Sequence, residues 1–328
     1  MALNARWIPK FTINDMVRAA IGIALVGFFL THEAEWKEFR FLQQLELWAY
    51  DARIRLFLPK TRDTRVIILD IDEKSLNAEG RFPWPRNKLA TMLKQLFERY
   101  QVRTVGFDIA LPEPDTSSGL PVFEAIAQNE LKDNAEYQAF LRGARASLNY
   151  DQILADEMVK WPVVLGVAMG GKEDIAGVLP PPVFDAKALG NVQYRYYTST
   201  GFSGNIEILQ KAATATGHFY PALDVDGITR RVPMFMRFKD GFYEALSLAV
   251  ARTYLGNAAV RIVLDEPRKI GGGLEGWMRS IKIGDIAVPL DRAMTAMVPY
   301  RDAGGFRYVS ATDVIRGTLP PDELKDKI

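Results

Sequence analysis

The stretch from Arg65 to Asp115 reads RVIILDIDEKSLNAEGRFPWPRNKLATMLKQLFERYQVRTVGFDIALPEPD. It opens with an apolar run at 66–69 and Ile71, which is typical of a strand covered by helices on both faces. A turn at 82–86 leads into a helix, because apolar residues then recur at intervals of three and four. These residues are Leu89, Met92, Leu93, Leu96, Phe97 and Tyr100. Residues 104–107 predict a second buried strand, so we expect a βαβ unit with parallel strands in one sheet.

Charged residues follow both predicted strands. Asp70 and Asp72 lie at the carboxyl end of the first strand, and Asp108 follows the second. Arg86 opens the helix between them. Because ligands of open α/β sheets bind at this edge, the four residues are a candidate site for a cation or a small polar molecule, with the metal unknown.

A structural interpretation of the same residues stays open. Asp72 or Ser75 can cap a short helix, and Arg86 can pair with Asp70 or Asp108 to hold the turn against the sheet. Structural ion-pair networks perturb charged groups much as binding sites do, so the structural interpretation is favoured.

The ordered set of motifs resembles a known family, the type 2 CHASE domain. These domains are the extracellular sensors of bacterial cyclases and histidine kinases. The motifs are LWAYDARIRLF at 47–57, DIDEKS at 70–75, FPWPR at 82–86, VGFDI and PEPD at 105–115, DVDGITRRVP at 224–233, ALSLAVAR at 245–252, SATDVIRG at 310–317 and LPPDELKDKI at 319–328. The resemblance covers nearly the whole chain and brings no established ligand-binding residues with it.

The resemblance also implies what surrounds this region. In the family, a segment like 319–328 precedes one more buried strand, further membrane helices and a cytoplasmic effector. We therefore expect 59–328 to be a sensor domain truncated before those parts. The expected effector in the same chain is an adenylate or guanylate cyclase, with a histidine kinase or diguanylate cyclase as alternatives. The region itself is expected to be no enzyme and to hold no cofactor.

Composition limits the partners. The 328 residues carry a formal net charge of +1, which gives no reason to expect a nucleic-acid partner. The chain has no cysteine, which excludes disulfides and thiolate metal sites. His32 and His218 are far apart in sequence, so each is expected to be a surface or packing residue.

The N-terminal segment predicts a membrane anchor at 16–31, preceded by a cytoplasmic N-terminus at 1–15. Its apolar run is short of the ~20 residues that span a bilayer, but Arg18 can reach the headgroups. Basic residues precede the run and Glu33, Glu35 and Glu38 follow it, so the positive-inside rule exports the rest of the chain. We expect the bacterial inner membrane, with the domain in the periplasm or extracellular space. The alternative is a buried helix of a soluble protein.

Residues 32–58 predict a stalk helix that continues the anchor. No Gly or Pro occurs from Glu33 to Leu58, and apolar residues recur at helical spacing until Pro59 ends the helix. The apolar stripe can be the seam of a parallel homodimer, or it can lie against the domain's own sheet.

The remaining pattern completes the fold class. Residues 122–160 predict a helical excursion and 163–169 a third buried strand. From Gly217 onward the pattern is antiparallel, with a hairpin of 218–225 and 228–238 around Asp226-Gly227. We predict an α/β fold in which helices flank a parallel-containing sheet. An antiparallel portion lies in the C-terminal half, and a transmembrane and stalk helix precedes the domain.

Three classes of function compete. The first is a membrane-anchored extracytoplasmic sensor, and the second is a structural dimerisation or partner-binding module without a small ligand. The third is an enzyme, since Asp70, Asp72 and Asp108 resemble the metal-binding aspartates of nucleotidyl cyclases. A near Walker A motif at 166–172 is rejected because Glu173 replaces the required Ser or Thr and no helix follows.

Overall fold

The computed structural model describes residues 12–33, 39–171, 174–270, 273–302 and 304–328. The chain divides into two units. One contains 1–58 together with 224–228, and the other contains 59–223 and 229–328.

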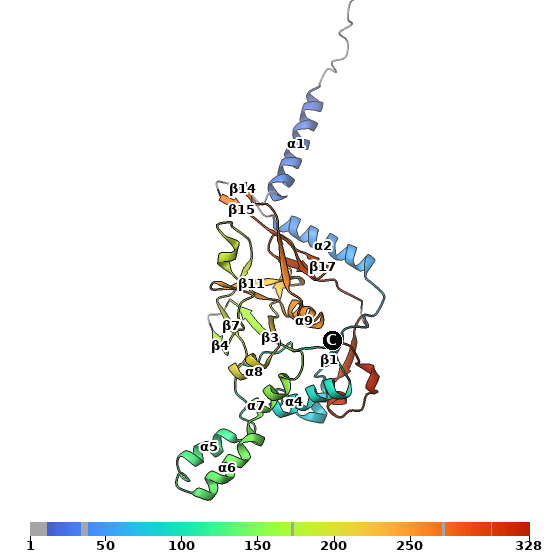
Figure 1. The fold of residues 1–328 in the computed structure, drawn as a ribbon. Coiled ribbons are helices and arrows are strands. Elements are labelled where there is room, and N and C mark those ends of the chain that lie inside the picture. The colour runs from blue at the N-terminus through green and yellow to red at the C-terminus, as the bar shows by residue number, and fades with distance from the viewer. Residues whose placement is uncertain (1–11, 34–38, 172–173, 271–272, 303) are drawn as a thin grey trace, which may run out of the picture. The chain divides into compact units, whose positions relative to one another are not determined.

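The described residues of the first unit form two helices, α1 (Ile13–Glu33) and α2 (Arg40–Phe57) (Figure 1). Over Ile13–Thr31, α1 is long and apolar enough to cross a membrane, by length and composition, and none of this stretch is buried. This is the segment where the sequence predicts the anchor. The predicted stalk is helical over α2 and ends before Pro59 as expected. The predicted continuity between the two helices falls on 34–38, outside the described residues.

The described residues of the second unit contain several parallel strand pairs, among them β11 (Phe235–Phe238) with β6 (Tyr197–Thr198) and β4 (Ile175–Ala176) with β7 (Gly201–Ser203). Strand β1 (Ile67–Asp70) pairs in parallel with β19 (Arg307–Ser310). Strand β2 (Val105–Gly106) pairs in parallel with β3 (Val163–Gly170), which also pairs in parallel with β8 (Ala215–His218). Strands are therefore present at all three predicted places, but only β3 is buried as predicted, because β1 and β2 are half-buried or exposed. However, β1 and β2 belong to different sheets rather than to one, because an apolar cavity separates them.

The connection between β1 and β2 is helical, as predicted, but its last turn is wider than an α-turn. Helix α3 (Glu73–Glu79) comes first, and α4 (Arg86–Lys94) follows. A π-helical turn, η1 (Gln95–Arg99), then continues α4 directly. The apolar residues of α4 and η1 are buried in one core cluster with Trp84, Leu154, Met158 and Val163.

The segment between β2 and β3 is the predicted helical excursion. It contains α5 (Leu120–Gln128), α6 (Ala135–Leu148) and α7 (Tyr150–Met158). Helices α5 and α6 pack together as a hairpin, and α7 packs on α4 (Figure 1). Asn134 and Asn149 cap α6 and α7 through their side chains, which explains why these helices begin where they do.

Antiparallel strands dominate the C-terminal half, as predicted. One sheet has the order β5 (Phe184–Asp185), β12 (Gly241–Glu244), β11 (Phe235–Phe238) and β6 (Tyr197–Thr198). A second has β18 (Thr295–Met297), β10 (Thr229–Pro233) and β9 (Ala222–Leu223), and a third has β13 (Val260–Leu264), β16 (Met278–Ile283) and β17 (Ile286–Pro289). The smaller strands are β14 (Arg268–Ile270), β15 (Gly273–Glu275), β4 (Ile175–Ala176) and β7 (Gly201–Ser203).

The predicted hairpin around Asp226-Gly227 is present but shorter than expected. It joins β9 to β10, and Gly227 has the positive φ of +80° that the turn requires. Residues 215–218 belong instead to the parallel strand β8, so the antiparallel pattern begins later than the sequence indicates. Strand β8 is buried on both faces. Such strands lack the alternation of apolar and polar residues that distinguishes an antiparallel strand from a parallel one.

The remaining helices are α8 (Glu207–Ala212), α9 (Leu246–Tyr254), α10 (Ala311–Ile315), η2 (Ala186–Leu189) and η3 (Pro321–Glu323). Helix α9 packs on β2, β3 and β8. The approach to β2 is so close that a Cβ atom on Gly106 would lie 2.6 Å from Cγ2 of Val250. A glycine at this position lets the helix cover the strand.

Substitution in β3 should show that the parallel strands hold the core. Leu165→Ala removes a fully buried side chain and should lower the free energy of unfolding by about 2–5 kcal/mol. The matched change Leu274→Ala, at a side chain that is 47% exposed, should cost less than about 0.5 kcal/mol. Urea denaturation of both variants measures the difference, and equal losses would contradict this assignment of the core.

Candidate functional site

Asp72 is a helix cap. Its Oδ1 accepts a hydrogen bond of 2.8 Å from the backbone N–H of Ser75 at the start of α3. Its Oδ2 accepts a second hydrogen bond from the hydroxyl of Ser310, at the end of β19. The bond from Ser310 and those from Ser75 lower the pKa of Asp72 below its ordinary value. Asp72 therefore ties the first helix after β1 to the neighbouring strand, in agreement with the structural interpretation of this residue.

Arg86 lies in a separate cluster of charges. Its Nε is 3.7 Å from Oδ1 of Asp151 on α7, and both side chains are largely buried. Its backbone N–H donates to Asp115 Oδ2 at 2.6 Å, and Asp115 N–H donates to Asp151 Oδ2 at 2.9 Å. The sequence predicted Asp70 or Asp108 as the partner of Arg86, but the charge that faces it is Asp151.

The cluster around Arg86 shifts two carboxyl groups in opposite directions. Burial raises the pKa of Asp151 above its ordinary value. Burial acts in the same direction on Asp115, but hydrogen bonds from Ser117 and Arg86 outweigh it, so the pKa of Asp115 is lowered. The arrangement fastens α4 and α7 to the loop after β2. It joins elements of the core rather than forming an open site.

Asp70 and Asp108 remain at the strand ends where the sequence places them. Asp70 is the last residue of β1 and Asp108 follows β2, and both are exposed. Neither carboxylate takes part in a side-chain hydrogen bond or ion pair with any described residue. The structure thus divides the four predicted residues, since Asp72 and Arg86 have structural partners whereas Asp70 and Asp108 face solvent.

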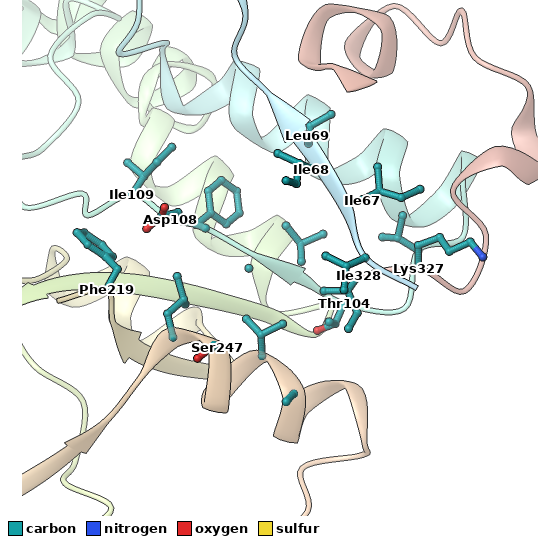
Figure 2. Close-up of a pocket in the computed structure, with 18 of the residues that line it drawn as sticks. Ile67, Ile68, Leu69, Thr104, Asp108, Ile109, Phe219, Ser247, Lys327 and Ile328 are labelled. Carbon is teal, nitrogen blue, oxygen red and sulfur yellow. The ribbon is translucent and has the colours of Figure 1, made fainter. Parts of the chain in front are cut away.

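An apolar cavity of about 960 Å³ separates β1 from β2 (Figure 2). Side chains of β1, the helices α4 and α9, and the end of β8 line it, and Asp108 stands at its margin. No pattern in the sequence predicts this cavity. Apolar residues that line a cavity and apolar residues that fill a core have the same periodicity, so no pattern in one chain distinguishes them.

His218 is the buried titratable group of this cavity. Its side chain is 1% exposed, and burial lowers its pKa to about 4, so the imidazole is neutral at pH 7. Its Nδ1 accepts a long hydrogen bond of 3.4 Å from the backbone N–H of Tyr220. Its Nε2 has no hydrogen-bond partner within the described parts of the chain. The expectation of a packing residue agrees with this burial.

The described residues do not bring the three predicted aspartates together. Nowhere in the described residues do three or more His, Asp or Glu side chains come together as a group that could hold a metal ion. Asp72 is engaged as a cap, and Asp70 and Asp108 end strands that are not hydrogen-bonded to each other. The aspartate set that resembled a cyclase centre is therefore not assembled in this chain.

The fold and the site define a mixed α/β domain preceded by one apolar helix, with exposed carboxylates at the ends of its parallel strands. Comparison with protein-family models matches the CHASE2 domain over residues 20–328. The chain belongs to the CHASE2 domain family, whose members are extracellular, non-catalytic sensor domains of receptors. Searches of curated proteins and of solved structures gave no match.

The burial of His218 predicts a pH dependence of stability. Its pKa is about 4 in the folded state and about 6.5 when unfolded, so the stabilisation is complete above pH 6.5. As the pH falls from 6.5 to 4, the unfolded state binds a proton that the folded state does not. The free energy of unfolding then decreases by about 1.4 kcal/mol per pH unit.

His218→Asn keeps a side-chain acceptor but removes the titration. Urea denaturation at pH 7, 6 and 5 should show a shallower pH dependence in this variant than in the parent. Equal slopes for the two proteins would contradict the burial of a neutral imidazole at this position.

Proposed function

We propose that this chain is the extracytoplasmic input region of a bacterial transmembrane receptor that regulates a cytoplasmic adenylate or guanylate cyclase. The observation that carries the proposal is the family match over 20–328, which includes most of the apolar helix as well as the domain. A CHASE2 domain is a sensor, and an apolar helix at its N-terminus is suited to anchor it in a membrane.

The charges around α1 support the orientation. Arg6, Lys10 and Arg18 lie on the amino side, whereas Glu33, Glu35 and Glu38 follow the apolar stretch. The positive-inside rule then keeps the N-terminus in the cytoplasm and exports 59–328. The inner membrane of a bacterium, with the domain in the periplasm or outside the cell, is the location we propose.

A homodimer is part of the same proposal. Five large apolar side chains of α2 are exposed, Phe57 among them, and the other four lie at intervals of four, three and eight residues: Phe41, Leu45, Trp48 and Leu56. This spacing places them along one stripe of the helix. A second copy of the chain, parallel to the first, would cover the stripe. A signal could then act by changing how the two chains are arranged.

Signalling requires unequal affinity for two states of the receptor. A ligand that binds both states equally shifts nothing, whatever its affinity. Asp70 and Asp108 are the exposed carboxylates that a cation or a small polar molecule could contact. We propose this edge as the ligand site, with the ligand's identity to be found by screening.

A structural module without a small ligand is the second candidate function. The observation that favours it is the engagement of Asp72 with Ser310 and of Arg86 with Asp151, which uses half of the predicted set for packing. Such a domain would respond to a partner protein or to its own assembly.

Cysteine labelling tests the export of the domain. The chain has no cysteine, so one introduced residue reports one position. Lys132→Cys lies in the exposed connection between α5 and α6. In intact spheroplasts, a membrane-impermeant maleimide should label Lys132→Cys but not Ala2→Cys, and lysis should make both reactive. Labelling of Lys132→Cys only after lysis would exclude an extracytoplasmic domain.

A thermal-shift series on the whole chain in detergent tests the ligand site. Divalent cations, nucleotides and small organic acids are added to the parent, to Asp70→Ala and to Asp108→Ala. Both residues are exposed, so the two substitutions should change stability by less than about 0.5 kcal/mol. A ligand present at 100 times its Kd should stabilise the parent by about 2.7 kcal/mol and the variants less.

Asp322→Ala, an exposed aspartate on η3, is the control. A ligand that stabilises the parent and all three variants equally would remove the site from the strand ends. The absence of any shift would favour the module without a small ligand.

A further inference from the structure

Two carboxylates meet one guanidinium in the cluster around Arg86. The Nε of Arg86, at the start of α4, is 3.7 Å from Oδ1 of Asp151 on α7. Asp115, in the loop after β2, is hydrogen-bonded to both residues. Its Oδ2 accepts from the backbone N–H of Arg86, and its own N–H donates to Asp151 Oδ2. When both acids are ionised, the three side chains together carry one negative charge that no cation of the cluster balances.

The cluster is buried and incompletely hydrogen-bonded. The exposed fraction is 7% for Arg86 and 9% for Asp151. Neither Arg86 Nε nor Asp151 Oδ1 has a hydrogen-bond partner within the described ranges, and 3.7 Å is too long for a hydrogen bond between the two atoms. An ionised carboxylate at this position lacks water and lacks a full set of donors, so burial makes its charged form costly.

The hydrogen bonds decide which of the two acids takes up a proton. Asp115 accepts N–H groups from Arg86 and Ser117, at 2.6 Å and 2.8 Å, and these bonds favour its ionised form. Among the described donors, Asp151 accepts only the N–H of Asp115. Burial raises the pKa of Asp151, whereas at Asp115 hydrogen bonds outweigh burial and lower the pKa. A proton on Asp151 therefore removes the unbalanced charge and leaves Asp115 paired with Arg86.

The other charges near α7 are occupied elsewhere. Helix α7 packs on α4, α6 and α8. Ion pairs of their own engage six charged side chains of these four helices: Lys88, Lys94, Arg145, Glu157, Glu207 and Lys211. Four more charged side chains of these helices and the loop are exposed: Glu113, Glu136, Arg142 and Asp156. The charges that act on Asp151 are therefore those of Arg86 and Asp115, in addition to its burial.

We propose that Asp151 is a proton-binding site, and that the proton it binds tightens the attachment of α7 and of the loop 109–115 to α4. The loop directly follows Asp108, one of the two carboxylates of the proposed ligand edge. A domain outside the cytoplasm meets the acidity of its surroundings, so external acid becomes a signal that this cluster receives. That last step rests on the proposed function, whereas the binding of the proton does not.

Linkage fixes the direction of the change. If the cluster opens to water, the pKa of Asp151 returns to its ordinary value of 3.8, which is below its value in the buried cluster. The closed cluster therefore binds the proton more tightly than the open one, and lowering the pH favours the closed state. Raising the pH leaves an unbalanced buried charge and favours opening.

Hydrogen exchange in the whole chain in detergent tests the proposal. The amides of Arg86 and Asp115 both donate within the cluster, so their exchange reports its opening. Their protection factors already allow for the pH dependence of chemical exchange. Between pH 7.5 and pH 5, these factors should rise at least about threefold in the parent. The amide of Tyr137 is the control, because it donates to Asn134, which does not titrate.

Three variants separate the proton site from a general effect of pH. Asp151→Asn keeps the size of the side chain but removes its titration, so the protection of both amides should no longer depend on pH. Asp156→Asn, at an exposed acid of the same helix, should keep the response of the parent. Asp115→Asn leaves one carboxylate for one guanidinium, so the response of the Arg86 amide should move to lower pH.

Protection in the parent that is unchanged or lower at pH 5 would overturn the proposal. A pH response that persists in Asp151→Asn would do the same. If Asp151→Asn does not fold, the comparison of the parent with Asp115→Asn decides, because an unshifted response in Asp115→Asn contradicts a shared charge. None of these measurements uses a ligand or an effector, so a negative result leaves the proposed sensor function standing.

Discussion

The hydrogen-bonding demand of two facing strand edges is the constraint on which this domain depends. Helices α4 and α9 cover the space between β1 and β2 with apolar side chains, so water is a poor partner for the peptide groups there. The close contact of Gly106 with Val250 brings α9 onto β2, and the π-turn after α4 keeps its apolar residues in the core. The two helices therefore cover strand edges whose inward-facing peptide groups need hydrogen-bond partners.

The sequence predicts the helices and strands of this fold better than it predicts which strands pair with one another. Apolar runs and helical spacing are local, so β1, β3, α4 and the excursion from α5 to α7 were found close to their observed bounds. The partner of β1 is β19, more than 200 residues away, and no local pattern carries that pairing. The placement of β1 and β2 in one sheet was wrong for the same reason. A crossover connection fixes the relative direction of the two strands that it joins. It does not fix whether the two strands are neighbours in the sheet.

The candidate site shows the same limit at the level of side chains. The cap at Asp72 was predictable because a cap is satisfied by a residue three positions away. The partner of Arg86 is on α7, where Asp151 lies in the predicted helical excursion. Which acid meets an arginine depends on how two helices cross, and that is set by their packing. The burial of His218 likewise follows from the parallel pairing of β8, which the sequence indicated as antiparallel.

The π-turn η1 affects the length of the connection between β1 and β2. A π-turn contains about one residue more than an α-turn, so this connection has one residue beyond what a regular helix of the same rise needs. Deleting a residue from Gln95–Arg99 would restore the α-helix and leave the residues after it in place, because the π-turn absorbs one extra residue. Tyr100, fully buried here, would keep its place in the core. Family members that lack the turn should therefore be one residue shorter in this connection and carry their buried aromatic one position earlier.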